Sequence, residues 1–402
     1  MTDAIFSILY NEAGTQYTTE KSTRTERRYD MSKTNTPFRY DYVGSFLRPE
    51  RLKKARADYE NKLITAEELK QVEDECIREL VQKQKDAGYQ VITDGEFRRA
   101  TWHLDFMWGF EGVGHSKTQI GLPFHGEDAM IDDTYLTGKV SVGHHPFVDH
   151  FKFVKELEDE NTVAKQTIPA PAQFLEQMIM PFALENTRKY YENTEDLVED
   201  IAKGYRKVIA DLYDAGCRNI QLDDCSWGML VDPRACDLFG TDKAGLDKIA
   251  EQLLHINNLA TQGAPEDLVI NTHVCRGNFH STYASSGAYD SVARTLFARE
   301  NVSAYYLEYD DERSGGFEPL REVSGDKKVV LGLITTKTPE LEDKDAVIAR
   351  IHEAAKYIPL DRLYLSPQCG FASCEIGNKL TEEQQWDKLK LVKEIAEEVW
   401  GE

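Results

Sequence analysis

The sequence has no apolar run as long as a membrane-spanning helix, and it has too few basic residues to balance its acids. Its 402 residues include 70 Asp and Glu but only 48 Lys and Arg, a formal net charge of -22. Because phosphate groups bind to positive fields, this charge argues against a protein that binds nucleic acid or an anionic membrane. The missing apolar run argues against a membrane-spanning helix, and residues 1–30 lack the apolar segment of a secretory signal.

Cysteine is also scarce. The seven cysteines are spread over a large chain, and an odd, scattered set is not a disulfide framework. This pattern predicts a reducing, cytoplasmic location, where thiols are available as metal ligands.

The beginning of the chain lacks any sustained periodicity. Residues 1–36 are polar and rich in Thr, Glu and Arg, which predicts a disordered N-terminal extension. Met31-Ser-Lys33 resembles a translation start, so the sequence leaves open whether the first thirty residues belong to the native protein or come from an upstream start codon. Residues 37–402 are expected to form a single domain.

From residue 37 onward, short apolar segments alternate with segments of helical periodicity. The predicted strands lie near residues 40, 91, 164, 220, 269, 304, 329 and 363. Repeated βα alternation favours a parallel sheet, and eight units are enough to close a (β/α)8 TIM barrel. An open doubly wound sheet is the alternative. The barrel is preferred because polar residues follow nearly every strand, whereas an open sheet concentrates them at one switch point.

One segment interrupts this alternation after the second predicted strand. Residues 98–160 are rich in aromatic residues and histidines, including Trp102 and Phe106. We interpret the segment as an inserted, lid-like element. His144 and His145 are neighbours within it, and because adjacent side chains diverge, no second metal site is expected there.

His273 and Cys275 follow an apolar strand two residues apart, so their side chains point to the same side. An imidazole and a thiolate are half of a zinc site, although a lone His-x-Cys is more often chance. In a closed barrel, Glu308 and Cys369 follow strands six and eight and converge with this pair on one rim. The four side chains suit tetrahedral zinc. Cys374 lies close in sequence and is the alternative ligand.

Polar residues also follow the first, second and fourth predicted strands. Ser45 follows the first, Glu96 the second, and Asp223 and Asp224 end the fourth. A solvated loop or a helix cap explains most acidic pairs. Here the strand mouth faces the predicted metal, which favours a role in the site.

Together these motifs resemble the catalytic C-terminal barrel of the cobalamin-independent methionine synthase family, in its short single-domain form. The matching stretches, in the family's order, are Val43-Gly-Ser45, Asp94-Gly-Glu-Phe-Arg98, Ile220-Gln-Leu-Asp223, His273-Val-Cys275, Leu307-Glu308 and Pro367-Gln-Cys-Gly370. They run from about residue 40 to the C-terminus, and the series His-x-Cys, Glu, Cys-Gly is specific.

The family holds a zinc ion that binds the thiol of homocysteine. By position, the implied zinc ligands are His273, Cys275, Glu308 and Cys369. The resemblance also implies that Glu96 and Asp223 bind the ammonium group of a homocysteine-like substrate and Ser45 its carboxylate. The implied reaction is methylation of this thiol, activated as a zinc thiolate, to a thioether such as methionine. The implied partners are the small-molecule thiol and a methyl donor, and a homo-oligomer is left open.

The part of the family's site that binds the methyl donor is altered. The long form's N-terminal barrel, which helps to bind folate, is absent. Phe174 is the one residue that could replace the family's aromatic partner of the pterin ring, and Lys337 stands where the family has a histidine. Asp223-Asp-Cys225 stands in place of the family's Asp-Glu-Pro. We therefore expect thiol methylation to be retained and leave the donor open between 5-methyltetrahydrofolate and another compound, with segment 98–160 as the candidate donor site.

Two other functions remain open at this point. One is a zinc-thiolate alkyltransferase or lyase that acts on another thiol, and the other is a non-catalytic zinc-binding barrel. The presence of Glu96 and Asp223 beside the full ligand set favours an enzyme.

Overall fold

The fold is built around a parallel sheet, which the computed structural model describes within residues 36–119 and 121–401. Six strands pair in parallel in the order β12-β11-β10-β9-β8-β7. Their bounds are β7 (Gln166–Pro169), β8 (Asn219–Asp224), β9 (Val269–Val274), β10 (Ala304–Glu308), β11 (Lys328–Ile334) and β12 (Leu363–Pro367). Nearly every residue in them is buried, as expected for strands covered on both faces. The predicted disordered extension, residues 1–36, lies outside the described residues apart from Thr36.

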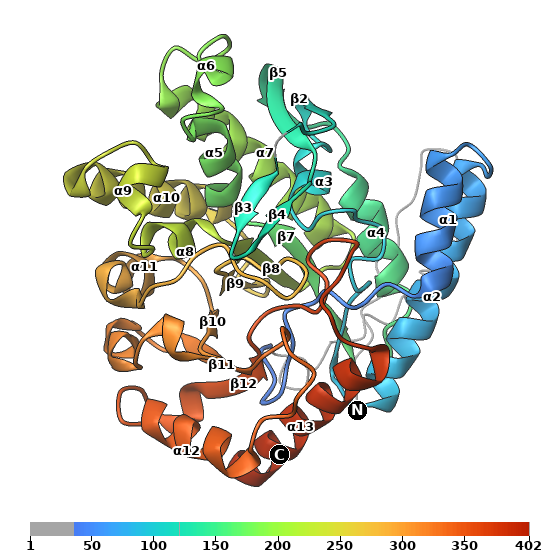
Figure 1. Cartoon of the computed structure of the whole chain (residues 1–402), viewed down its shortest axis with the longest axis vertical. Helices are drawn as coiled ribbons and strands as arrows, with labels where there is room; N and C mark the ends of the chain where they lie inside the picture. Colours follow the sequence, from blue (N-terminus) through green and yellow to red (C-terminus); the bar gives the residue numbers. More distant parts are fainter. Residues whose placement is uncertain (1–35, 120, 402) are drawn as a thin grey trace, which may run out of the picture. The chain divides into compact units, whose positions relative to one another are not determined.

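Two further segments close the sheet into a barrel. β1 (Val91–Ile92) pairs in parallel with β6 (Val163–Ala164), which leads directly into β7. At the opposite edge, Tyr40 forms a parallel bridge to Leu365 of β12. The first predicted strand is therefore extended chain with one bridge, and the hydroxyl of Tyr42 links it to β1 by donating to the carbonyl of Val91. The predicted (β/α)8 TIM barrel is confirmed, and the open-sheet alternative is wrong (Figure 1).

The long helices surround the strands, as Figure 1 shows. They are α1 (Glu50–Glu60), α2 (Ala66–Asp86), α4 (Pro146–Lys155), α5 (Pro171–Ile179), α7 (Thr194–Asp214), α10 (Lys243–Thr261), α11 (Ala293–Arg299), α12 (Lys344–Ala354) and α13 (Glu382–Trp400). Several begin where a short polar side chain accepts from the third backbone N–H of the helix, as Thr65 does for α2 and Thr381 for α13. No helix in the described part of the chain is both long and apolar enough to cross a membrane.

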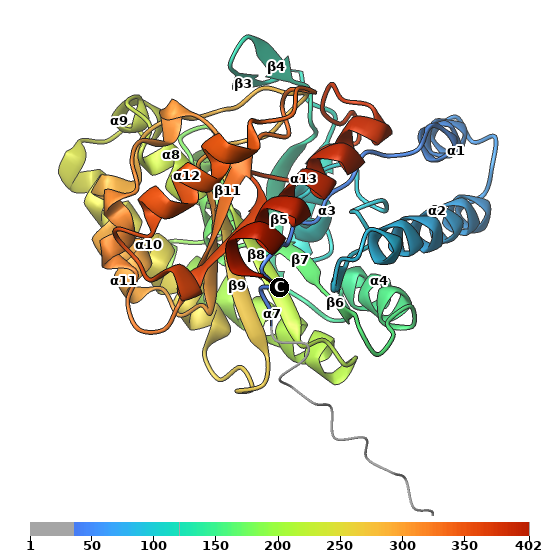
Figure 2. The ribbon, with the colours of Figure 1, turned by 90° about the horizontal axis from the view of Figure 1, so that it is seen from below.

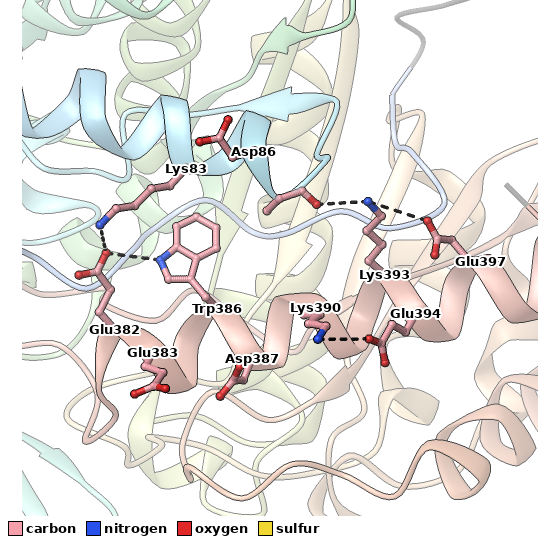
Figure 3. Close-up of a pocket in the computed structure, with 11 residues that line it drawn as sticks. Lys83, Asp86, Glu382, Glu383, Trp386, Asp387, Lys390, Lys393, Glu394 and Glu397 are labelled. Carbon is pink, nitrogen blue, oxygen red and sulfur yellow. Dashed lines mark hydrogen bonds and ion pairs between the residues drawn. The ribbon is translucent and has the colours of Figure 1, made fainter.

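α2 and α13 meet along a shallow groove at the molecular surface (Figure 3). Lys83 of α2 pairs with Glu382 at the start of α13, and the indole of Trp386 lies beside this pair. These side chains are largely exposed, so the pairs contribute little to stability.

Short helices and strands lie in the segments that connect the barrel strands and the long helices. Between β7 and β12 they are α6 (Leu184–Thr187), α8 (Ser226–Leu230), α9 (Ala235–Leu238), η1 (Tyr289–Ser291), η2 (Glu312–Ser314), η3 (Glu318–Glu322) and η4 (Leu360–Arg362). The segment between β1 and β6 holds α3 (Leu104–Met107), β2 (Glu111–Ser116), β3 (Leu122–Phe124), β4 (Glu127–Ala129), β5 (Asp133–Ser141) and then α4. β2 pairs with β5 and β3 with β4, both antiparallel.

The β3–β4 hairpin lies beyond one end of the barrel strands (Figure 2). It is tied to the loop that follows β9, because the N–H of His125 donates to the carbonyl of Tyr283 and the carboxylate of Glu127 pairs with His280. α4, by contrast, packs against β6 and α7, as an ordinary barrel helix does. The part of residues 98–160 that departs from the βα alternation therefore ends before α4.

Candidate metal centre and the two cavities beside it

Three strand ends bring the four predicted ligands together. His273 lies in β9, Cys275 one residue beyond it, Glu308 at the end of β10 and Cys369 two residues beyond β12. Their ligand atoms all lie within 4.8 Å of one another, and all four residues are buried. In the described part of the chain, this is the one group of such side chains with that geometry.

The donor atoms fit a tetrahedral zinc ion. The Sγ atoms of Cys275 and Cys369 are 3.7 Å apart, much too far for a disulfide. Two thiolates at zinc–sulfur distances of about 2.3 Å lie about 3.8 Å apart in a tetrahedron. Nδ1 of His273 is 3.2 Å from the carbonyl oxygen of Tyr306, which leaves Nε2 buried without a hydrogen-bond partner. A carbonyl that orients the ring through Nδ1 is typical of metal-binding histidines.

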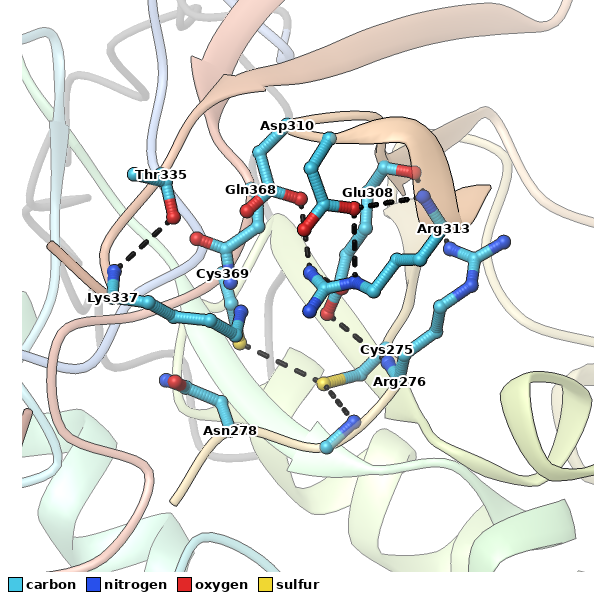
Figure 4. Close-up of polar contacts among 12 residues, drawn as sticks. Cys275, Arg276, Asn278, Glu308, Asp310, Arg313, Thr335, Lys337, Gln368 and Cys369 are labelled. Atoms are coloured by element: carbon cyan, nitrogen blue, oxygen red, sulfur yellow. Dashed lines mark hydrogen bonds and ion pairs between the residues drawn. The ribbon is translucent and has the colours of Figure 1, made fainter. Parts of the chain in front are cut away.

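Cations surround the carboxylate of Glu308 (Figure 4). Its Oε1 accepts the backbone N–H of Arg276 at 3.0 Å, and its Oε2 lies 3.3 Å from the guanidinium of Arg313. Burial would raise the pKa of Glu308, but the charges of Lys337, Arg313 and Arg276 outweigh it and lower the pKa below its usual value. Glu308 is thus held ionised, the form that binds a metal.

The surroundings of the Cys275 and Cys369 thiols raise their pKa values, in contrast to that of Glu308. The neighbouring thiol of Cys225 and burial raise the pKa of Cys275, and the thiol of Cys275 and burial raise that of Cys369. A divalent cation among these groups reverses that effect, because coordination favours the thiolate. The ligand set therefore has the charge and spacing of a metal site.

Ser45, Glu96 and Asp223 line one cavity together with His273, Cys275 and Cys369. The cavity is narrow, and buried side chains form most of its wall. The structure thus places the predicted substrate residues, which come from three strand ends, beside the predicted metal ligands, which come from three others.

Glu96 and Asp223 are two buried carboxyl groups that lie close enough for their negative charges to repel each other. Oε1 of Glu96 accepts from Thr167 at 3.0 Å and pairs with Arg99 at 3.3 Å, while Oε2 is buried without a partner. Burial raises the pKa of Asp223, and Glu96 raises it further; burial likewise raises the pKa of Glu96. A cationic group between them would stabilise both ionised forms.

Asp223 is held in place by a buried polar chain inside the barrel. The amide of Gln221 donates to its Oδ1 at 2.7 Å, and the amide oxygen of Gln221 accepts from Lys165 at 3.1 Å. Lys165 in turn pairs with Asp41 at 3.0 Å, with both side chains fully buried. Asp223 is therefore oriented by partners that cannot exchange with solvent.

Ser45 packs directly against the turn that carries Cys369. Its Oγ accepts the N–H of Ala372 at 3.3 Å, and a Cβ at position 370 would lie 1.9 Å from that oxygen. Gly370 therefore allows the first and last strand ends to approach each other.

Several other predicted features lie outside the cluster. Asp224 lies just before the N-cap residue of α8, and its Oδ1 accepts the N–H of Ser226, the first residue of that helix, at 2.9 Å. Cys374 is not within the metal cluster and lines a second cavity instead. Phe174 does not line either cavity; it packs in the core against Phe110 and Tyr205. The suggestion that Phe174 replaces the family's aromatic residue is therefore wrong, because α5 turns that face of the helix inward.

Sequence reasoning missed three residues of the site. Trp102, Cys225 and Asn278 line the small cavity and also the second cavity beside it. The thiol of Cys225 hydrogen-bonds with that of Cys275. The position of Cys225 directly after Asp223 and Asp224 was the one available signal for it.

The second cavity is larger and mostly apolar. It measures about 500 Å³, within the range of about 300–1,000 Å³ that is usual for small-molecule sites. The β3–β4 hairpin, the end of α5, and α8 and α9 form its walls. The three shared residues place it next to the inner cavity.

Comparison with known proteins agrees with this geometry. Residues 183–398 match the family described as cobalamin-independent synthase, catalytic domain. The Bacillus subtilis (strain 168) protein YxjG is 42% identical over 386 residues, which cover 95% of this chain and 99% of that protein. A crystal structure from Listeria monocytogenes, which carries the provisional name vitamin-B12 independent methionine synthase, is 39% identical; the match covers 91% of this chain and 99% of that one with a TM-score of 0.72. A B12-independent methionine synthase from Shewanella sp. W3-18-1 shares the fold at 21% identity, with a TM-score of 0.65 over 90% of this chain and 97% of that one.

Proposed function

The chain belongs to the cobalamin-independent synthase family, and from this premise we propose that it is a zinc-dependent S-methyltransferase that converts homocysteine to methionine. The observation that carries the proposal is the shared cavity. Three of the four metal-binding side chains, His273, Cys275 and Cys369, line it together with Ser45 and the two buried carboxyl groups, and Glu308 completes the ligand cluster beside it. A thiol amino acid has matching groups at its two ends.

His273, Cys275, Glu308 and Cys369 would hold the zinc ion. When bound there, zinc supplies Lewis-acid chemistry, lowering the pKa of a coordinated thiol so that the thiolate is available at neutral pH. Two thiolates and one carboxylate from the protein provide three negative charges, which keeps that sulfur nucleophilic.

The other residues of the cavity orient the substrate. Glu96 and Asp223 accept hydrogen bonds from its ammonium group, which restores the ionised form of both acids. Ser45 binds the carboxylate. Because the cavity is small and buried, the thiol is held in one position and water is excluded from it.

The seven free thiols agree with a protein of the reducing cytoplasm. A zinc-thiolate enzyme for a different thiol is the second candidate. It is disfavoured by the two buried carboxyl groups, which a thiol without an ammonium group would leave unpaired.

The test combines metal analysis with a methylation assay. We expect about one zinc ion per chain, together with formation of methionine from homocysteine and a methyl donor drawn from 5-methyltetrahydrofolate, methylcobalamin and sulfonium compounds. Cys369→Ser should lose both the zinc and the activity. Cys374→Ser, which changes a nearby thiol outside the cluster, should keep the zinc. Purified protein without zinc, or Cys369→Ser with full zinc and activity, would contradict the proposal.

A further inference from the structure

The larger cavity has the position required of a second substrate site. Trp102, Cys225 and Asn278 line both cavities, so a molecule in the larger one lies against the residues that surround Cys275 and Cys369. Its volume of about 500 Å³ accommodates a small molecule, whereas the narrow inner cavity has no room for a second molecule beside the thiol substrate.

The walls of this cavity exclude one class of ligand. Leu122, Phe124, Met229 and Phe279 are representative of its mostly apolar lining. Arg234 is the one permanently cationic side chain among the described residues that line it, and it already pairs with Asp232 at 2.8 Å. A polyanionic tail would therefore find no cluster of cations here.

Among the described residues that line this cavity, Glu176 is the one buried carboxyl group. Glu176, in α5, is 5% exposed and lines the cavity. Its Oε2 accepts from Nε2 of Gln173 at 3.1 Å, and Oε1 of Gln173 accepts the N–H of Cys225 at 3.0 Å. Gln173 thus fixes Glu176 on the wall that leads to the thiol site. The other carboxyl oxygen of Glu176 has no hydrogen-bond partner in the described part of the chain, so it is free to meet a ligand.

The surroundings of Glu176 keep its carboxyl group protonated. Burial, and then the charge of Asp224, raise its pKa to about 8. The titratable or charged groups that face it from the elements around the cavity are His103, Asp224, Cys225, Arg234, Asp237 and Cys374. Burial lowers the pKa of His103 to about 3, so this imidazole is neutral. Glu176 is consequently the group of this cavity best suited to give up a proton near neutral pH.

Building on the proposed methyl transfer, we propose that the larger cavity binds the methyl donor and that Glu176 is a catalytic acid that protonates the donor's leaving nitrogen. The donor class is an N-methyl tertiary amine on an apolar body without a polyanionic tail. The cavity wall and the position of Glu176 beside Cys225 carry this assignment.

The step balances without any further reactant. The substrate thiolate sulfur attacks the methyl carbon, the S–C bond forms and the C–N bond breaks, and the bonding pair moves to nitrogen. The Glu176 carboxyl proton passes to that nitrogen, so the donor leaves as a neutral amine and Glu176 remains as a carboxylate. It regains a proton from solvent before the next turnover.

Glu176→Gln tests the acid, and Glu300→Gln is the matched control. Glu300 is also buried, has its pKa raised to about 8 by burial and by Asp224, and accepts from the same polar network through Asn257, but it does not line the cavity. Two methyl donors are compared in the zinc-loaded proteins. They are 5-methyltetrahydrofolate with a single glutamate, which needs a proton on its leaving nitrogen, and methyl iodide, whose iodide leaves without one.

With the folate, kcat of Glu176→Gln should fall by about 10²-fold or more, as expected for the loss of a general acid. Methyl iodide should alkylate homocysteine at the wild-type rate, and the zinc content should not change. In the wild type and in Glu300→Gln, kcat with the folate should decline above about pH 8, where Glu176 loses its proton; this decline should be absent in Glu176→Gln. Glu176→Asp should recover part of the rate.

Three results would overturn the assignment. One is an unchanged folate rate in Glu176→Gln. Another is an equal loss with both donors, which indicates a structural role. The third is a wild-type protein that uses methyl iodide but no N-methyl amine. If homocysteine is alkylated by neither donor in the wild type, the proposed methyltransferase function itself fails, and the acid with it.

Discussion

The two cavities at the mouth of this barrel are built in opposite ways. The inner one is surrounded by ionisable side chains at strand ends, each held by buried partners such as Gln221 for Asp223 and Arg276 for Glu308. The outer one is bounded by apolar side chains from a hairpin and short helices, with Glu176 as its buried acid. The difference shows where rigidity is needed: a nucleophile must be held in one ionisation state and position, whereas an apolar body binds by area and shape.

Removal of the metal should produce the largest effect, because it leaves three acidic groups and an imidazole within 4.8 Å of one another without a cation. We expect a chelator to abolish methyl transfer, by about 10³-fold or more. It should also lower Tm, since a ligand present at 1,000 times its Kd stabilises the folded state by about 4 kcal/mol. Calorimetry with and without chelator measures this. Cys275→Ser is the control and should show no shift on chelation. If the chelated protein kept its Tm and its activity, the inner cluster would hold no functional metal, and the contrast with the outer cavity would be lost.

The charged end of the inner cavity should give the next largest effect. Glu96→Gln removes one of two carboxylates that we assign to the substrate ammonium, and a hydrogen bond to a charged group is worth about 1.5–3 kcal/mol. The value of kcat/KM for homocysteine should therefore fall by about 10–100-fold, with the zinc content unchanged. Alkylation of 2-mercaptoethanol, which has no ammonium group, should be affected little. An equal loss with both thiols would show that Glu96 acts on the fold and not on the substrate.

Close packing around the inner cavity should make it intolerant of a single methyl group. In Gly370→Ala the new Cβ would lie 1.9 Å from Oγ of Ser45 and 3.0 Å from its Cβ, so the Ser45 hydroxyl must turn away from its present partner or the turn after β12 must shift. We expect a destabilisation of about 1–3 kcal/mol together with a loss of activity, measured by denaturant unfolding and by the methylation assay. Gly138→Ala is the matched control, because its Cβ would meet only a backbone atom at 3.7 Å. Equal stabilities of the two variants would show that this packing is loose.

The apolar cavity should tolerate substitution best. Phe124→Ala in β3 removes one ring from the wall and should raise KM for the methyl donor by about 3–10-fold, with KM for homocysteine and zinc content unchanged. Phe182→Ala at the rim, where the side chain is 63% exposed, should change KM for the donor by less than about two-fold. If Phe124→Ala raised KM for homocysteine more than KM for the donor, our assignment of the donor to the outer cavity would be wrong.

Much of this arrangement could be predicted from the sequence, because strand and helix periods are local properties. The barrel and the clustering of His273, Cys275, Glu308 and Cys369 followed from which residues come directly after each strand. The short first strand and the packing of α4 as a barrel helix could not be predicted, because both depend on how neighbouring elements pack. Phe174 was misplaced for the same reason: sequence position does not show which face of α5 is turned to the core.

By itself, the sequence determined the alternation of strands and helices and the chemical types of the residues at the barrel mouth. Only the tertiary structure decided that Cys275 and Cys369, 94 residues apart, lie 3.7 Å from each other. It also decided that Glu176 is buried in the apolar wall of the adjoining cavity. The physical reason is that hydrogen-bonding and periodicity act between near neighbours in the chain, whereas distances across the barrel and the pKa of a buried acid are set by closure and by the exclusion of water.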